Sequence, residues 1–242
     1  MRVCLVYQSS RYMGKGALIR MSHYIRVENL SKKIGSKVVL QDINFELEGG
    51  KIYGFIGENG SGKTMLFRTM SGLIKPSSGT VWLDESNVHK SCEKKVGIIL
   101  ENGTMWPELT GYENLLYLSR LNNYISKQEI VASLERVGLD PKNLLPIRKY
   151  SLGMRQRLML AQAIMEKPNY IFLDEPTNAI DKKGVQLVYN IIREEAERGA
   201  VVCVSSHVDE DISNLCEEVY WMEKGICKKV VNENEKTSIS DR

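Results

Sequence analysis

The sequence predicts an α/β protein with a mainly parallel sheet, and three observations point to this fold. A glycine-rich stretch, residues 57–64, stands between a short apolar run and a segment typical of a helix. Two further runs, 170–173 and 200–204, are apolar throughout, as in strands buried on both faces of a parallel sheet. Segments with helical periodicity separate these runs, and alternating strands and helices are the pattern of an α/β fold.

The first strands are expected between residues 24 and 56. Ile25, Val27 and Leu30 alternate with polar residues, which is the period of a half-buried strand. A second strand-like run covers 38–47, and we interpret the two as an antiparallel edge. The apolar run 52–56 is a third strand, directly before the glycine-rich stretch.

The glycine-rich stretch matches the phosphate-loop pattern G-x-x-x-x-G-K-[ST] at every fixed position. Its glycines let backbone N–H groups face a phosphate, and the helix that follows points its positive end at the same place. Lys63 adds a cation for the outer phosphates, and the Thr64 hydroxyl is a candidate Mg²⁺ ligand. A plain surface turn is the alternative, but it does not explain the flanking strand and helix. The residues expected to bind phosphate are Gly57, Glu58, Asn59, Gly60, Ser61, Gly62, Lys63 and Thr64.

The middle of the chain is predicted to be largely helical. Residues 75–79 form a turn cluster, and strands are expected at 80–83 and 96–100. From about 103 to 165 the apolar residues recur at helical spacing, and the last of these helices should run from Ser151 to Glu166. We interpret this part as an inserted helical subdomain whose apolar faces are packing surfaces.

The α/β pattern then resumes and sets the expected domain boundaries. A helix is predicted over about 181–198, another over 208–216, and a strand over 219–222. The domain should therefore span 23–230. Residues 1–22 are expected to be a disordered extension that lacks the form of a secretory signal, and 231–242 a flexible tail.

Two carboxylates follow the apolar strand 170–173. Ligands in open α/β sheets gather at the carboxyl ends of the strands, so Asp174 is a candidate to hold Mg²⁺ together with Thr64. Glu175 comes next and is a candidate general base that polarises an attacking water. An acidic turn without a function is the alternative, and the phosphate loop makes it the weaker one.

Charge and composition argue against nucleic-acid-binding, disulfide-bonded and membrane-spanning proteins. The formal net charge is +3, and the basic residues of the first 20 positions account for this excess, so the remaining chain is close to neutral. A neutral body argues against a nucleic-acid partner. The 5 cysteines form no C-x-x-C pair, which is typical of a reduced cytosolic protein. No apolar run approaches the roughly 18 residues that a membrane helix needs.

With these motifs in order, the chain resembles the ATP-binding subunit of an ATP-binding-cassette (ABC) transporter. Residues 150–157, Tyr-Ser-Leu-Gly-Met-Arg-Gln-Arg, are similar to the family's signature motif, usually LSGGQ, and Ser151 caps the helix that it opens. Residues 176–181 are similar to the D-loop, and His207 to the switch histidine. The resemblance covers about 24–228 and implies a P-loop NTPase core with an inserted helical subdomain.

The resemblance also implies roles for residues and partners. ATP and Mg²⁺ would lie between two nucleotide-binding subunits, a homodimer or a heterodimer. Hydrolysis would energise a separate membrane permease, with the chain peripheral at the cytoplasmic face of the membrane. We suggest residues 102–112, with Met105, Trp106 and Pro107, as the contact surface, and the alternative is that Trp106 packs within the helical subdomain. By resemblance the catalytic residues are Glu175 and His207, the additional cofactor-binding residues Ser151, Gly153 and Asp181, and the metal ligands Thr64, Asp174 and Glu101.

Several positions depart from the family pattern. Glu101 stands where the Q-loop has a glutamine, and Ile34 where an aromatic residue commonly stacks on adenine. Leu152 and Met154 differ from the usual signature. Together, Glu101 and the run 151–156 are similar to the bacitracin- and lantibiotic-immunity branch of bacterial exporters, which implies export of a peptide antibiotic or another small molecule.

Two other functions agree less well with this sequence. A cassette ATPase that acts on nucleic acid or ribosomes is disfavoured by the single cassette and the neutral body. A regulatory subunit that binds ATP without turnover would explain the departures, but Lys63, Asp174, Glu175 and His207 are all present. The transported substrate is not encoded here, because that specificity belongs to the permease.

Overall fold

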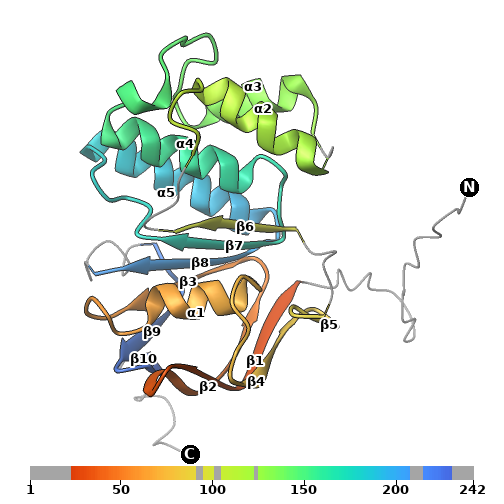
Figure 1. Cartoon of the computed structure of the whole chain (residues 1–242), viewed down its shortest axis with the longest axis vertical. Helices are drawn as coiled ribbons and strands as arrows, with labels where there is room; N and C mark the ends of the chain where they lie inside the picture. The colour runs from red at the N-terminus through yellow and green to blue at the C-terminus, as the bar shows by residue number, and fades with distance from the viewer. Residues whose placement is uncertain (1–22, 91–94, 101–104, 123–124, 208–214, 231–242) are drawn as a thin grey trace, which may run out of the picture.

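The computed structural model describes residues 23–90, 95–100, 105–122, 125–207 and 215–230 (Figure 1). In this part of the chain, two sheets lie below a layer of helices in the view of Figure 1. The expectations for 1–22 and 231–242, and nearly all of the helix expected over 208–216, concern residues outside those described.

The larger sheet has 6 strands in the order β10-β9-β3-β8-β7-β6 and is parallel except at β10. The predicted mainly parallel sheet is therefore confirmed. Its central strands β7 and β8 are buried along their whole length, as their unbroken apolar sequences predict. The strands are β3 (Lys51–Ile56), β6 (Val96–Ile99), β7 (Tyr170–Asp174), β8 (Val201–Ser206), β9 (Glu218–Glu223) and β10 (Ile226–Val230).

The expected antiparallel strands are also confirmed, and they belong to a sheet of their own. This sheet has 4 strands in the order β2-β1-β4-β5. The predicted end of the turn over 75–79 is wrong. Ser78 already belongs to strand β4 and pairs with Ser31 of β1. The strands are β1 (Tyr24–Ile34), β2 (Lys37–Glu48), β4 (Ser78–Leu83) and β5 (Ser86–Asn87).

Helices cover both faces of the parallel sheet. Alternate side chains of its strands point to opposite faces, and both faces carry apolar side chains that must be buried. On one face, α1 (Lys63–Met70) lies between the two sheets, where Phe67 packs on Phe55 and Phe172. On the other face, Ile171 and Val202 belong to a second core that includes the remaining helices. These helices are α2 (Gly111–Asn122), α3 (Lys127–Arg136), the 3₁₀ turn η1 (Ile147–Lys149), α4 (Leu152–Ile164) and α5 (Lys182–Glu197).

The predicted helical subdomain is present as α2, α3 and α4 above the sheet (Figure 1). Side chains at the termini set two of these helices. Ser126 and Glu129 form a capping box at the start of α3, and the Ser151 hydroxyl accepts a hydrogen bond from the Met154 N–H at the start of α4. No helix among the described residues is long and apolar enough to span a membrane.

An ion-pair network joins the helical subdomain to α5. Arg136, the last residue of α3, contacts Glu194 at 2.7 Å and Glu195 at 2.6 Å. The Glu195 carboxylate is buried and is also held by Arg198 at 2.6 Å. Because a buried carboxylate is stable only with partners, this network resists separation of α3 from α5.

Arg136→Ala is expected to lower the free energy of unfolding by about 1–3 kcal/mol, because a buried carboxylate loses a charge-assisted hydrogen bond. Urea unfolding measures this effect. Arg148→Ala is the matched control, since Arg148 contacts Glu108 at the similar distance of 2.7 Å with both side chains exposed. Its effect should stay below about 1 kcal/mol. Equal effects of the two substitutions would contradict the buried linkage.

Candidate functional site

The phosphate loop connects β3 to α1, as the sequence predicts. Gly62 has a φ of 115°, which side chains rarely tolerate, and it directly precedes the first residue of α1. A Cβ on Gly57 would come within 2.2 Å of the Met222 carbonyl oxygen of β9, so only glycine fits there. The loop is therefore held closely against the sheet, with the first N–H groups of α1 at its end.

The ammonium group of Lys63 places a positive charge inside this loop. The residue is buried, and its ammonium donates to the carbonyl oxygens of Gly57 at 2.6 Å and Glu58 at 3.3 Å. These contacts keep the ammonium beside the backbone N–H groups that would meet a phosphate. The loop thus combines a helix N-terminus with a fixed positive charge, which is an anion-binding arrangement.

Asp174 lies at the end of β7 and is only 2% exposed. One of its carboxylate oxygens accepts a hydrogen bond from the Thr64 hydroxyl at 2.5 Å, and the other from the Ser205 hydroxyl at 2.5 Å. Thr64 and Asp174 therefore lie together, as their expected metal-binding role requires, and hydroxyl and carboxylate oxygens fit the ligand preference of Mg²⁺. The third expected ligand, Glu101, lies outside the described residues.

Glu175 follows in a strained backbone conformation, with a φ of 51°. Its N–H donates to the backbone oxygen and the hydroxyl of Ser205, both at 3.2 Å. Its carboxylate lies 2.9 Å from the ring nitrogen Nδ1 of His207. A non-glycine residue in this region of φ costs about 1–3 kcal/mol, and this strain persists only where surrounding contacts impose it.

The surroundings of Glu175 shift the pKa of its carboxyl group. Burial raises the pKa of the Glu175 carboxyl above its ordinary value, while the His207 contact and the charge of Lys63 act in the opposite direction. A carboxyl with a raised pKa is a stronger proton acceptor once it is ionised. The two residues expected to be catalytic, Glu175 and His207, are therefore in direct contact, which the sequence did not predict.

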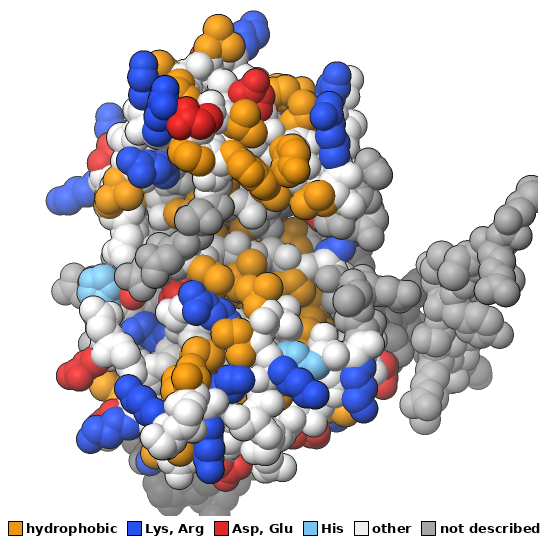
Figure 2. Space-filling view, in the orientation of Figure 1, with side chains coloured by type: hydrophobic (Ala, Val, Ile, Leu, Met, Phe, Trp, Pro, Cys, Tyr) orange, Lys and Arg blue, Asp and Glu red, His pale blue; other side chains and the backbone are white. Residues whose placement is uncertain are grey.

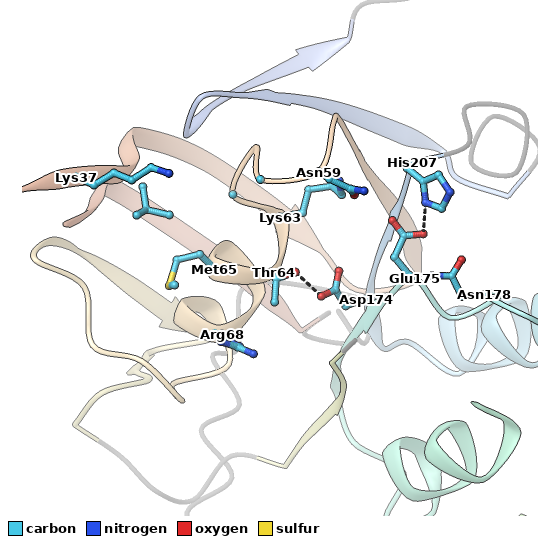
Figure 3. A pocket seen from close by; sticks show the side chains of 13 residues that line it. Lys37, Asn59, Lys63, Thr64, Met65, Arg68, Asp174, Glu175, Asn178 and His207 are labelled. Carbon is cyan, nitrogen blue, oxygen red and sulfur yellow. Dashed lines mark hydrogen bonds and ion pairs between the residues drawn. The ribbon is translucent and has the colours of Figure 1, made fainter. Parts of the chain in front are cut away.

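These residues line one pocket with a volume of about 540 Å³, within the range of small-molecule sites. Figure 3 shows Thr64 and Asp174 at its centre, with Glu175 and His207 toward one end and Lys37 toward the other. The lining residues are Lys37, Val39, Asn59, Gly60, Gly62, Lys63, Thr64, Met65, Arg68, Asp174, Glu175, Asn178 and His207.

The end of the pocket far from His207 was not found by sequence reasoning. Lys37 and Val39 of β2 line it together with Met65 of α1. Ile34, where the family pattern places an aromatic residue, is 53% exposed and is not one of these lining residues. The alternation of β2 alone does not reveal which of its side chains turn toward α1.

Three expected cofactor-binding residues lie apart from this pocket. Ser151 is exposed at the start of α4, followed by Gly153. The Asp181 side chain caps α5 by accepting a hydrogen bond from the Gly184 N–H at 2.9 Å. None of the three lines the pocket described above.

Comparison with known proteins gives a consistent result. A family model described as "ABC transporter" matches residues 40–178. An uncharacterized ABC transporter ATP-binding protein of Bacillus subtilis, YybJ, is 47% identical over 203 residues, which cover 83% of this chain and 93% of that protein. The bacitracin transport ATP-binding protein BcrA of Enterococcus faecalis is 37% identical over 219 residues, covering 89% of this chain and 71% of BcrA.

A lantibiotic transport ATP-binding protein of Streptococcus pyogenes, SrtF, is 29% identical over 211 residues, covering 87% of this chain and 90% of SrtF. Among solved structures, a dimeric bacterial ABC transporter cassette, MJ0796, has a TM-score of 0.77 at 22% identity, covering 86% of this chain and 99% of that one. At this identity the structural match concerns the fold.

Lys63→Ala is expected to weaken binding of a nucleoside triphosphate by about 10- to 100-fold, the equivalent of one charge-assisted hydrogen bond. Titration calorimetry with ATP measures this affinity. Lys142→Ala, at an exposed position away from the loop, is the control and should bind as the parent does. Unchanged affinity in Lys63→Ala would contradict the phosphate-binding assignment.

Proposed function

Because this chain belongs to the ABC transporter family as an ATP-binding subunit, we propose that it binds ATP with Mg²⁺ and hydrolyses it to energise a separate membrane permease. The observation that carries this proposal is the convergence of Lys63, Asp174, Glu175 and His207 on one pocket. An anion site, a metal-ligating pair and a buried carboxylate together form the set of groups that phosphoryl transfer to water uses.

In this proposal the loop 57–64 binds the phosphates through its N–H groups and the Lys63 ammonium. Thr64 and Asp174 would hold Mg²⁺, which neutralises phosphate charge when bound. Ser205 keeps Asp174 in place, since its hydroxyl donates to the carboxylate. Because Asp174 is buried, its ionised form needs such partners in every state of the site.

Glu175 is the proposed base. In its ionised form it accepts the proton of the attacking water, while its backbone N–H and its carboxylate stay fixed by Ser205 and His207. Lys63 and the N-terminus of α1 stabilise the negative charge that develops on the phosphate oxygens. His207 is about half exposed and lines the same pocket, and in this proposal its ring would contact the terminal phosphate.

The exposed start of α4 supports binding of the nucleotide between two copies, in a homodimer or a heterodimer. A triphosphate with its metal extends beyond what a single helix N-terminus neutralises. Ser151 and Gly153 would supply a second helix N-terminus from the other subunit, with Asp181 nearby at the start of α5. ATP then joins the copies, and its cleavage separates them.

The contact with the permease is proposed at residues 105–107 of the described chain. Trp106 is 42% exposed, and its ring packs against Tyr117 with a centroid distance of 4.5 Å. Its backbone is held on both sides by the buried Asn114 side chain, at 2.9 and 3.1 Å. Figure 2 shows hydrophobic side chains gathered over the helical layer on this face. A rigid, half-exposed aromatic pair suits a protein interface and a peripheral position at the membrane.

We further propose export of a peptide antibiotic or another small molecule. The names of BcrA and SrtF state bacitracin and lantibiotic transport for those relatives. Glu101 and the run 151–156 support the same branch. The energy-coupling role does not depend on this choice, because substrate recognition belongs to the permease.

Glu175→Gln should lower ATP hydrolysis by about 10²- to 10⁴-fold while leaving ATP affinity unchanged, because the amide keeps the shape but cannot accept the proton. Single-turnover phosphate release and calorimetry with MgATP measure the two quantities. Near-normal turnover in this variant would remove Glu175 from the role of base. A parent chain that binds ATP without turnover would instead support the regulatory subunit.

Ser151→Arg, made in the Glu175→Gln chain, should prevent the dimer that MgATP induces, because a long side chain would fill the phosphate end of the second site. Light scattering coupled to gel filtration measures the mass. Ser126→Arg removes the hydroxyl that caps α3 and is the matched control, which should dimerise. An unaffected dimer in Ser151→Arg would show that α4 does not meet the nucleotide.

Coexpression of this chain with its membrane permease should raise the bacitracin concentration that inhibits a sensitive host. Glu175→Gln should abolish this resistance, and Trp106→Ala should reduce it while leaving the ATPase activity of the isolated chain intact. Ile226→Ala is the control, since Ile226 is 42% exposed but lies on β10. Resistance that survives Glu175→Gln would refute export driven by this site.

A further inference from the structure

One contact links the signature-like helix α4 to the proposed base within the same chain. The amide nitrogen of Gln156 donates to the backbone carbonyl oxygen of Glu175 at 3.0 Å. Gln156 is only 8% exposed and lies on the second turn of α4. A buried side-chain amide aimed at one carbonyl oxygen orients that peptide group, because leaving it unpaired is costly.

This carbonyl belongs to the residue with the strained backbone. The φ of 51° at Glu175 is held on the N–H side by Ser205 of β8. Gln156 holds the carbonyl side and comes from a different element, α4. Since a left-handed backbone persists only when its surroundings impose it, the direction of the Glu175 carboxylate depends on both contacts.

A second contact shows that α4 rests on the segment that follows Glu175. A Cβ on Gly153 would lie 3.2 Å from the Ala179 carbonyl oxygen, so the first turn of α4 approaches this turn closely. The Gln156 hydrogen bond and the Gly153 approach are one turn apart on the same helix. A displacement of α4 therefore displaces the backbone of residues 175–179.

We infer that Gln156 is a positioning residue for ATP hydrolysis, which directs the Glu175 carboxylate by holding its carbonyl oxygen and ties that direction to the place of α4. The inference rests on the proposed function, in which Glu175 is the base. In the proposed dimer, Ser151 at the start of α4 meets the nucleotide of the other copy. Gln156 thus connects that nucleotide to the base of its own chain.

The test compares ATP hydrolysis by the full chain with that of three variants. Gln156→Leu removes the donor, and Gln156→Glu keeps the shape of the side chain but cannot donate when ionised. Gln186→Leu is the matched control, because Gln186 donates at the same distance of 3.0 Å to Asn190 on the exposed face of α5. Circular dichroism establishes that each variant is folded.

Both Gln156 variants should lower kcat by about 10- to 100-fold, the scale of a small misplacement of a catalytic group. The KM for ATP should change by less than about twofold, since the phosphate loop is intact. The control should match the parent in both quantities. If Gln156→Leu fails to fold, the shape-preserving Gln156→Glu decides by its kcat.

Parent-like kcat in the Gln156 variants would overturn the inference, as would a rise in KM without a fall in kcat. Glu175→Gln, measured in the same assay, distinguishes failure of the proposed function from failure of the role proposed for Gln156. If that variant hydrolyses ATP normally, the proposed function fails. If it is inactive while both Gln156 variants match the control, only the role of Gln156 fails.

Discussion

The site depends on three neighbouring parallel strands, β3, β7 and β8, which end side by side at the same edge of the larger sheet. β3 leads into the phosphate loop, and β7 and β8 end beside it, with Asp174 in register with Ser205. Because of this register, the Ser205 hydroxyl reaches the Asp174 carboxylate and the Thr64 hydroxyl reaches its other oxygen. A shift of one residue in either strand pair would reverse the side-chain directions and separate these groups.

Burial and strain at this edge are balanced by packing elsewhere. A buried Asp174 and a left-handed Glu175 are both unfavourable in isolation. The helices that cover the two faces of the sheet supply the apolar cores that hold the strand ends in place. Two parts of α4 face different surroundings. Its start is exposed, while Gln156 on its second turn donates a hydrogen bond to the Glu175 backbone. In the proposed dimer, α4 would therefore connect the nucleotide of the other copy to the Glu175 backbone of its own chain.

Much of this architecture could be predicted from the sequence, because the decisive signals are local. The glycine pattern places the phosphate loop, and the unbroken apolar runs identify β7 and β8 as central strands. Contacts between distant segments could not be predicted in the same way. Neither the hydrogen bond from Gln156 nor the place of Lys37 in the pocket has a local pattern, and the φ of Glu175 results from its partners. The antiparallel strands were expected at an edge, but pairing of β1 with β4 gives them a separate sheet.

The central claim is that one nucleotide is held by two copies of this fold. The most direct test is an experimental structure of the Glu175→Gln chain with ATP and Mg²⁺. The account predicts a dimer in which the terminal phosphate lies between Lys63 of one copy and the Ser151 hydroxyl of the other, within hydrogen-bonding distance of both. A triphosphate contacted by a single chain, with the start of α4 remote from any nucleotide, would contradict it.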